Sequence, residues 1–155
     1  MKKLALYISI LSTTLFVSCS SDDNAVDTQK PEITLLEPGD HEGFLPGSEI
    51  HIEGLITDNE ALASYKIEIH AAEDGHTHGR RSTNYFQYEQ TFQITENTKV
   101  YELHRHVEIP ENINGETLTN GHYHLGIFAL DKAGNQQQVF TEIYIGNDAE
   151  EHTHG

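Results

Sequence analysis

Apolar and polar residues alternate in a series of short segments from residue 31 onward, which is the pattern of β-strands with one buried face. In the clearest segment, 121–131, Tyr123, Leu125, Ile127 and Ala129 fall on one side. Gly, Pro, Asp and Asn separate the segments, and no stretch has the 3.6-residue period of an amphipathic helix. The segments expected to form strands are 31–38, 49–57, 65–70, 85–95, 100–109, 121–131 and 139–145. Seven short strands without a helix predict an all-β fold, an antiparallel β-sandwich.

Two positions interrupt the alternation. Gly54 falls within 49–57, and we expect a glycine bulge there, after which Leu55 or Ile56 continues the buried stripe of Ile50 and Ile52. Arg105 falls at an inward position of 100–109, so we expect a bulge or the end of the buried stripe at that point. The segments 39–47 and 110–120 hold turn and polar residues and are expected to be connections.

Segment 121–135 reads Gly-x-Tyr-x-Leu-x-Ile-x-Ala-x-Asp-x-Ala-Gly-Asn. It resembles the F strand and F–G turn of bacterial immunoglobulin-like domains, with Tyr123 placed like the tyrosine of a tyrosine corner, two residues before the core position Leu125. Segment 58–70, Asp-Asn-Glu-x-Leu-x-Ser-Tyr-Lys-Ile-Glu-Ile-His, followed by Asp-Gly-His-Thr-His-Gly at 74–79, resembles a Bacteroidota lipoprotein family of immunoglobulin-like domains of unknown function. This resemblance covers most of residues 30–146, and it implies a fold and a location but no activity.

The N-terminus has the features of an export signal. Lys2 and Lys3 precede an apolar run, 4–17, that is too short to span a bilayer as a helix. Phe-Val-Ser-Cys at 16–19 resembles a lipobox, so we expect cleavage before Cys19 and lipidation of this residue, the single cysteine of the chain. Residues 20–24 resemble the acidic tag of surface-exported lipoproteins, and a solvated tether is the alternative. We therefore expect an outer-membrane lipoprotein at the cell surface, or otherwise on the periplasmic face.

Four segments follow from these patterns. They are a signal peptide at 1–18, a lipidated cysteine and acidic tether at 19–29, an immunoglobulin-like β-sandwich at 30–147 and a flexible histidine-rich tail at 148–155. Loss of the signal peptide leaves seven basic residues against 25 acidic ones, a formal charge of −18 with neutral histidines. Such a charge repels nucleic acid and anionic headgroups and attracts cations. We expect membrane contact only through the lipid on Cys19.

Histidine pairs are the most unusual feature of the sequence. Eight of the eleven histidines occur as His-x-His, at His76/His78, His104/His106, His122/His124 and His152/His154. Residues i and i+2 of a strand project from one face about 6.6–7 Å apart, so two imidazoles that lean together can share a metal ion. Four such pairs indicate selection for imidazole as a ligand.

The immunoglobulin-like topology predicts which of these histidines meet. Strand C, 65–70, ends at the pole where strand F, 121–131, begins, so we expect one site on the outer face at that pole, formed by His70, His76, His78, His122 and His124. His104 and His106 either join that site or form a second one. His152 and His154 either fold over the ion or collect metal loosely in the tail. His41 and His51 are unpaired, and we favour surface or cap roles for them.

Imidazole and carboxylate without thiolate suit Zn²⁺, Cu²⁺ or Ni²⁺, and the sequence does not choose among them. Glu68, Glu73 and Asp74 are placed to complete the shell or to orient an imidazole. At the opposite pole, Asp58, Asn59 and Glu60 in one turn and Asp131 with Asn135 in another offer oxygen ligands for Ca²⁺. Because Asp and Asn are also what such turns require for their backbone shape, we favour the turn role there.

Three classes of function remain. The first is a non-enzymatic lipoprotein that captures, buffers or transfers zinc or copper, with an outer-membrane receptor or transporter as a possible partner. The second is a metalloenzyme, since copper/zinc superoxide dismutase also carries His-x-His on a Greek-key sandwich, but its cysteines and glycine-rich signature are missing here. The third is an adhesion or glycan-binding module that uses tyrosines such as Tyr85 and Tyr88. We favour the first.

Overall fold

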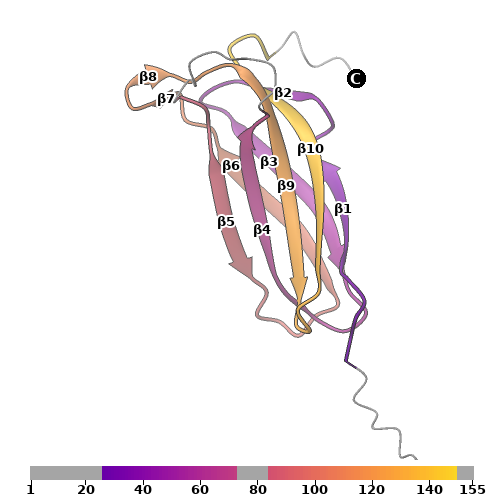
Figure 1. Ribbon diagram of the computed structural model, residues 1–155. Helices are drawn as coiled ribbons and strands as arrows, with labels where there is room; N and C mark the ends of the chain where they lie inside the picture. The colour runs from indigo at the N-terminus through magenta and orange to yellow at the C-terminus, as the bar shows by residue number, and fades with distance from the viewer. Residues whose placement is uncertain (1–25, 73–83, 150–155) are drawn as a thin grey trace, which may run out of the picture.

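Two β-sheets lie face to face in the computed structural model, which describes residues 26–72 and 84–149 (Figure 1). One sheet has three strands in the order β1 (Glu32–Glu37), β3 (Glu49–Thr57), β6 (Val100–Glu108). The other has five in the order β2 (Glu42–Phe44), β10 (Gln136–Ile145), β9 (Gly121–Asp131), β4 (Leu62–Ala71), β5 (Tyr88–Gln93). A small hairpin, β7 (Asn112–Ile113) and β8 (Glu116–Thr117), completes the described strands. The all-β sandwich is confirmed, and strands C and F of the prediction, β4 and β9, pair in one sheet.

The core lies between the sheets and follows from the alternation of side chains along the strands. On β3 the inward residues Ile50, Ile52 and Ile56 have no exposed surface, and on β9 Leu125 and Ile127 have none. Full burial of each such side chain contributes roughly 1.5–3 kcal/mol to folding. The outward positions of these strands are therefore free to carry polar residues, and this is where the histidines lie.

Tyr123 forms the tyrosine corner that the resemblance predicted. Its hydroxyl donates to the carbonyl oxygen of Thr119 at 3.1 Å and accepts from the backbone N–H of Phe86 at 3.2 Å. Burial raises the pKa of Tyr123 to about 12, although the hydrogen bond from Phe86 acts in the opposite direction. The corner ties the segment before β5 to the start of β9, the strand that carries His122 and His124.

The bulge expected at Gly54 is wrong. β3 pairs with β6 in an unbroken register from Glu49 to Thr57, and the register shift lies instead in β1, between Leu35 and Glu37. A Cβ on Gly54 would lie 2.6 Å from the carbonyl oxygen of Thr34, so glycine is needed here for the close approach of β1. Ile56 rather than Leu55 continues the buried stripe, because the alternation is never interrupted.

The irregularity expected at Arg105 is also wrong. β6 remains regular, and Leu103 and Val107 on either side of Arg105 are both buried. The guanidinium lies 4.6 Å from the ring centre of Phe92 on β5 and 5.7 Å from that of Tyr65. Arg105 therefore covers the core between β6 and β5, the last strands of the two sheets, and keeps its charge on aromatic faces.

Three short strands lie in segments that were predicted to be connections. β2 lies within 39–47 and pairs in parallel with the end of β10, and β7 and β8 lie within 110–120. β4 and β10 also begin three residues earlier than the sequence predicted.

In the part of the chain that the structure describes, no helix has the length and apolar character to cross a membrane.

Candidate metal centre

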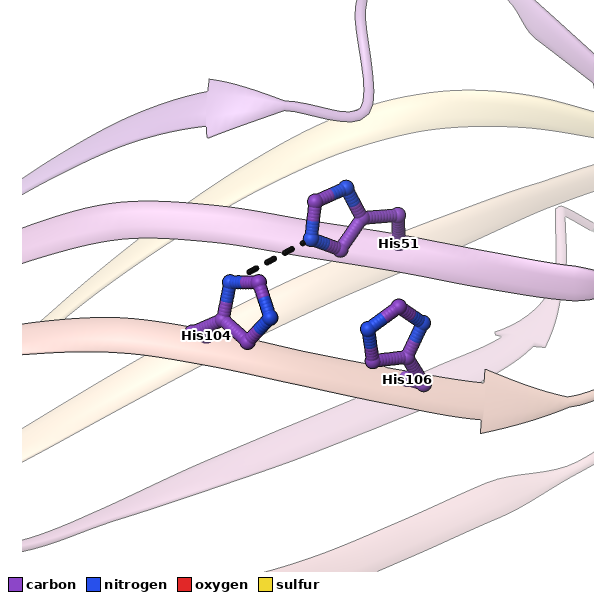
Figure 2. Close-up of side chains that lie close together, drawn as sticks. All are labelled: His51, His104 and His106. Atoms are coloured by element: carbon purple, nitrogen blue, oxygen red, sulfur yellow. Dashed lines mark hydrogen bonds between the residues drawn. The ribbon is translucent and has the colours of Figure 1, made fainter.

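Three histidines meet on the outer face of the three-stranded sheet (Figure 2). His51 lies on β3, and His104 and His106 lie on the neighbouring strand β6. The ladder pairs His51 directly with His106, and Glu53 with His104. Residues i and i+2 of each strand thus form a two-by-two patch of side chains that all project from one face.

One imidazole nitrogen from each of the three histidines lies within 4.8 Å of the other two. Nε2 of His51 is 3.3 Å from Nδ1 of His104, and the two rings are edge-on with centres 4.7 Å apart. The ring of His106 stacks on that of His51 at 4.7 Å. Since the His106 side chain is 51% exposed, rotation about its side-chain torsions can redirect it, at the cost of its stacking on His51 and its contact with Glu49.

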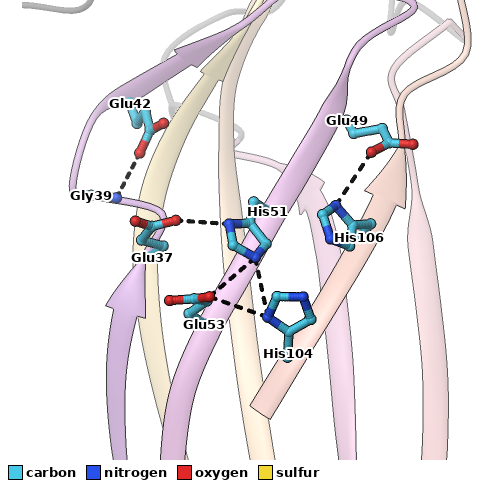
Figure 3. Close-up of polar contacts among 8 residues, drawn as sticks. All are labelled: Glu37, Gly39, Glu42, Glu49, His51, Glu53, His104 and His106. Carbon is cyan, nitrogen blue, oxygen red and sulfur yellow. Dashed lines mark hydrogen bonds and ion pairs between the residues drawn. The ribbon is translucent and has the colours of Figure 1, made fainter.

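Glutamates from β3 and the end of β1 complete this patch (Figure 3). Oε1 of Glu53 is 3.4 Å from Nε2 of His51 and 3.1 Å from Nδ1 of His104, so these three atoms form a nearly equilateral triangle. Oε2 of Glu37 lies 2.9 Å from Nδ1 of His51, and Oε2 of Glu49 lies 3.3 Å from Nδ1 of His106. We call His51, Glu53, His104 and His106 the β3/β6 cluster.

The triangle has the dimensions of a metal shell. Two ligand atoms at about 2.0–2.1 Å from a tetrahedral ion are separated by roughly 3.3–3.4 Å. The three separations in the triangle are 3.3, 3.4 and 3.1 Å. Oε2 of Glu37 is placed to accept a hydrogen bond from Nδ1–H of His51, which leaves the lone pair of Nε2 free toward the triangle, as carboxylates do for histidine ligands in metal proteins.

A second group, His41, His122 and Glu142, lies at one edge of the five-stranded sheet. Oε1 of Glu142 on β10 is 3.0 Å from Nδ1 of His41 and 2.9 Å from Nδ1 of His122. His41 precedes β2 in a left-handed conformation, with φ of 61°, and its backbone N–H donates to the carbonyl of Glu142 at 2.7 Å. Both imidazoles therefore share one carboxylate oxygen.

His70 and His124 form a cross-strand pair on the same outer face. They are partners in the β4–β9 ladder, and their rings are edge-on with centres 5.5 Å apart. Oε1 of Glu68 lies 3.8 Å from Nε2 of His70, and Glu142 is the ladder partner of His124. Within the described part of the chain, neither His70 nor His124 belongs to a group of three donors within 4.8 Å.

The structure thus distributes the predicted ligands over two sheets. His70, His122 and His124 share one face as expected, whereas His104 and His106 lie on the other sheet, where they form the second location that the sequence had left open. For the unpaired His41 and His51 we had favoured surface or cap roles. In the structure, each of them belongs to a group of potential metal donors. His51 could have been noticed, because it faces outward between Ile50 and Ile52, but its partner on β6 depends on long-range register. The candidate residues Cys19, Glu73, Asp74, His76, His78, His152 and His154 lie outside the described residues.

At the opposite end of the domain, Asp58 and Asp131 lie together with Asp27, which precedes β1. The sequence had paired Asp58 and Asp131 with Glu60 instead. The side chain of Glu60 is not part of this group, and its backbone N–H donates to Oδ2 of Asp58 at 2.9 Å. Asp131 organises the turn after β9, since its carboxylate accepts from the backbone N–H groups of Gly134 and Asn135.

A family profile for a domain of unknown function, DUF4625, matches residues 17–146. The chain belongs to the DUF4625 family. A search of curated proteins found no match.

Several solved structures are similar to this chain at low sequence identity. The chain is 13% identical to OgpA from Akkermansia muciniphila, with a TM-score of 0.47, and covers 30% of that protein with 76% of its own length. It is 16% identical to fibronectin(III)-like modules of Clostridium thermocellum CbhA, with a TM-score of 0.40, and the match covers 74% of this chain and 96% of the module. For a β-glucosidase from Listeria innocua the identity is 10%, the TM-score 0.44 and the coverage 76% of this chain and 16% of the enzyme.

Proposed function

We propose that this DUF4625 domain binds a transition-metal ion at the β3/β6 cluster. The observation that carries the proposal is the triangle formed by Nε2 of His51, Nδ1 of His104 and Oε1 of Glu53, whose edges match those of a tetrahedral ligand shell. His106 supplies a fourth donor on the same face. An ion in this position also offsets the charge of Glu37, Glu49 and Glu53 around it.

The donor set narrows the choice of metal. Imidazole nitrogens with a carboxylate oxygen and no thiolate suit Zn²⁺, Cu²⁺ and Ni²⁺. Copper(II) and nickel(II) prefer square-planar or tetragonal arrangements, whereas zinc accepts a tetrahedral one. The edges of the triangle therefore favour zinc.

The proposed role is binding and transfer rather than catalysis. Four side chains fill a tetrahedral shell, and a catalytic zinc instead keeps a position open for water or substrate. The ligands are partly exposed, with 35% of the His51 side chain and 61% of the His104 side chain accessible, so a bound ion is within reach of another protein. Together with the predicted lipid on Cys19, this favours a lipoprotein of the outer membrane that captures, buffers or hands over metal at the cell surface to a receptor or transporter.

The adhesion or glycan-binding alternative has less support. Tyr85 packs edge-on against the corner residue Tyr123 at 6.0 Å, and the hydroxyl of Tyr88 donates to Gln90 on its own strand. Both rings thus make contacts within the domain.

Isothermal titration of metal-free protein with zinc tests the proposal. The variant with His51→Ala and His104→Ala is expected to lose at least about 100-fold in affinity, because two of the four ligands are gone. The variant with His70→Ala and His124→Ala is the matched control, since it also removes two outward histidines from neighbouring strands, and it should retain the wild-type affinity at this site. Equal zinc binding by wild type and the first variant would refute the proposal.

A further inference from the structure

The acidic group at the opposite end of the sandwich has a chemistry that is different from that of the histidines. Carboxylate oxygens of Asp27, Asp58 and Asp131 lie within 4.8 Å of one another. Asp131 is 2% exposed. The ion pairs found among the described residues join none of the three to a lysine, arginine or histidine.

Two oxygens of this group have no partner among the residues that the structure describes. Oδ2 of Asp27 and Oδ1 of Asp58 are shielded from solvent, and neither takes part in a hydrogen bond with a described residue. The other oxygen of each carboxylate is satisfied, in Asp27 by Gln29 and Asn59 and in Asp58 by Glu60. Buried carboxylate oxygens without a donor are costly and call for a cation or a proton.

The group also joins the segment before β1 to the sandwich. Asn135 donates from Nδ2 to the backbone carbonyl of Asp27 at 3.1 Å and to Oδ2 of Asp131 at 2.7 Å. Asn59, next to Asp58, donates to the Asp27 carboxylate at 3.0 Å. The three aspartates thus come from the entering chain, the turn after β3 and the end of β9, and two asparagines already hold the entering chain in place.

We propose that Asp27, Asp58 and Asp131 bind a calcium ion that fastens the N-terminal segment to the domain. An all-oxygen group of three carboxylates suits a hard cation, and calcium accepts irregular shells of carboxylates, carbonyls and water, whereas magnesium requires a near-ideal octahedron. Calcium sites of extracellular modules have dissociation constants of about 10⁻⁴–10⁻³ M. The site shares no residue with the β3/β6 cluster, so either can exist without the other.

Calcium titration of protein freed of divalent ions tests this site. One ion per chain is expected, with a rise in the midpoint of thermal unfolding. Asp27→Asn should weaken calcium binding by about tenfold or more, since affinity follows the number of ligand charges. This variant keeps the fold, because Asp27 precedes the first strand. Glu60→Gln, which removes a neighbouring carboxylate outside the group, should bind as wild type.

The variant with His51→Ala and His104→Ala should bind calcium as the wild type does. This result would show that the calcium site is independent of the transition-metal site. Asp58→Asn provides a second test in which the loss should be similar. Absence of calcium binding at 10-fold above the expected dissociation constant, or equal affinity in wild type and Asp27→Asn, would overturn the assignment. Magnesium binding as tight as calcium binding would overturn the choice of ion.

Discussion

The tyrosine corner yields the most closely defined prediction. Tyr123→Phe removes a hydroxyl that donates to Thr119 and accepts from the backbone N–H of Phe86, a residue that is 5% exposed. The lost donation costs about 0.5–1.5 kcal/mol, and the unsatisfied N–H of Phe86 costs about 1–3 kcal/mol. We therefore expect the free energy of unfolding at pH 7 to fall by about 2–4 kcal/mol, with a melting temperature lower by roughly 6–16 °C for a domain of this size.

The same substitution should change how stability depends on pH. The pKa of Tyr123 is raised to about 12 in the folded protein, against about 10 in an unfolded chain. The contribution of this neutral hydroxyl is fully present below about pH 10, and it is lost as the pH rises toward 12, since the unfolded state releases its proton first. Wild type should lose about 2–3 kcal/mol more than Tyr123→Phe over this interval.

Urea unfolding followed by circular dichroism at pH 7, 9, 10, 11 and 12 measures both effects. Tyr85→Phe is the matched control, because it removes a hydroxyl from the adjacent, half-buried ring and leaves both hydrogen bonds of Tyr123 intact. Burial also raises the pKa of Tyr65, but this residue is present in all three proteins and cancels in the comparison. A Tyr123→Phe protein as stable as wild type at pH 7, or one with the same loss of stability above pH 10, would refute the reasoning.

Three further predictions concern the core and the metal site. Gly54→Ala should lower the free energy of unfolding by about 1–3 kcal/mol in urea titrations, because the new Cβ meets the carbonyl oxygen of Thr34 at 2.6 Å and β1 must move; unchanged stability would contradict this contact. Arg105→Met should change stability by less than about 1 kcal/mol, and Arg105→Ala should cost more, because packing on Phe92 is kept in the first variant alone; equal losses would contradict that role. Zinc affinity should fall steeply from about pH 7 to 5, because imidazole binds metal in its neutral form; constant affinity across this range in calorimetry would argue against histidine ligands.

Much of the fold could be predicted because it depends on local alternation. Ile50 and Ile52, or Leu125 and Ile127, identify the buried face of their strands without knowledge of any partner, and the 121–135 motif indicates the position of Tyr123. The place of the β1 irregularity could not be predicted, since it is set by the approach of Thr34 to Gly54 across the sheet. The short strand β2 could not be predicted, because three residues are too few to show an alternation and the strand is defined by its pairing with β10.

The candidate sites show the same division. The outward direction of His104 and His106 followed from strand parity, but their contact with His51 depends on the register of β3 against β6. The sequence predicted one histidine site at one pole because the prediction considered only the sheet that contains strands C and F. The sandwich has two outer faces, and the histidines lie on both. Asp27 was assigned to the tether, where no pattern recurs, and its position beside Asp58 is a tertiary contact that no local signal reveals.

Anomalous X-ray scattering from crystals grown with zinc tests the central claim most directly. The account predicts a zinc peak on the outer face of the three-stranded sheet, with Nε2 of His51, Nδ1 of His104 and Oε1 of Glu53 each at about 2.0–2.2 Å from the ion. A crystal whose zinc lies only at other residues, with the β3/β6 cluster still joined by hydrogen bonds alone, would contradict it.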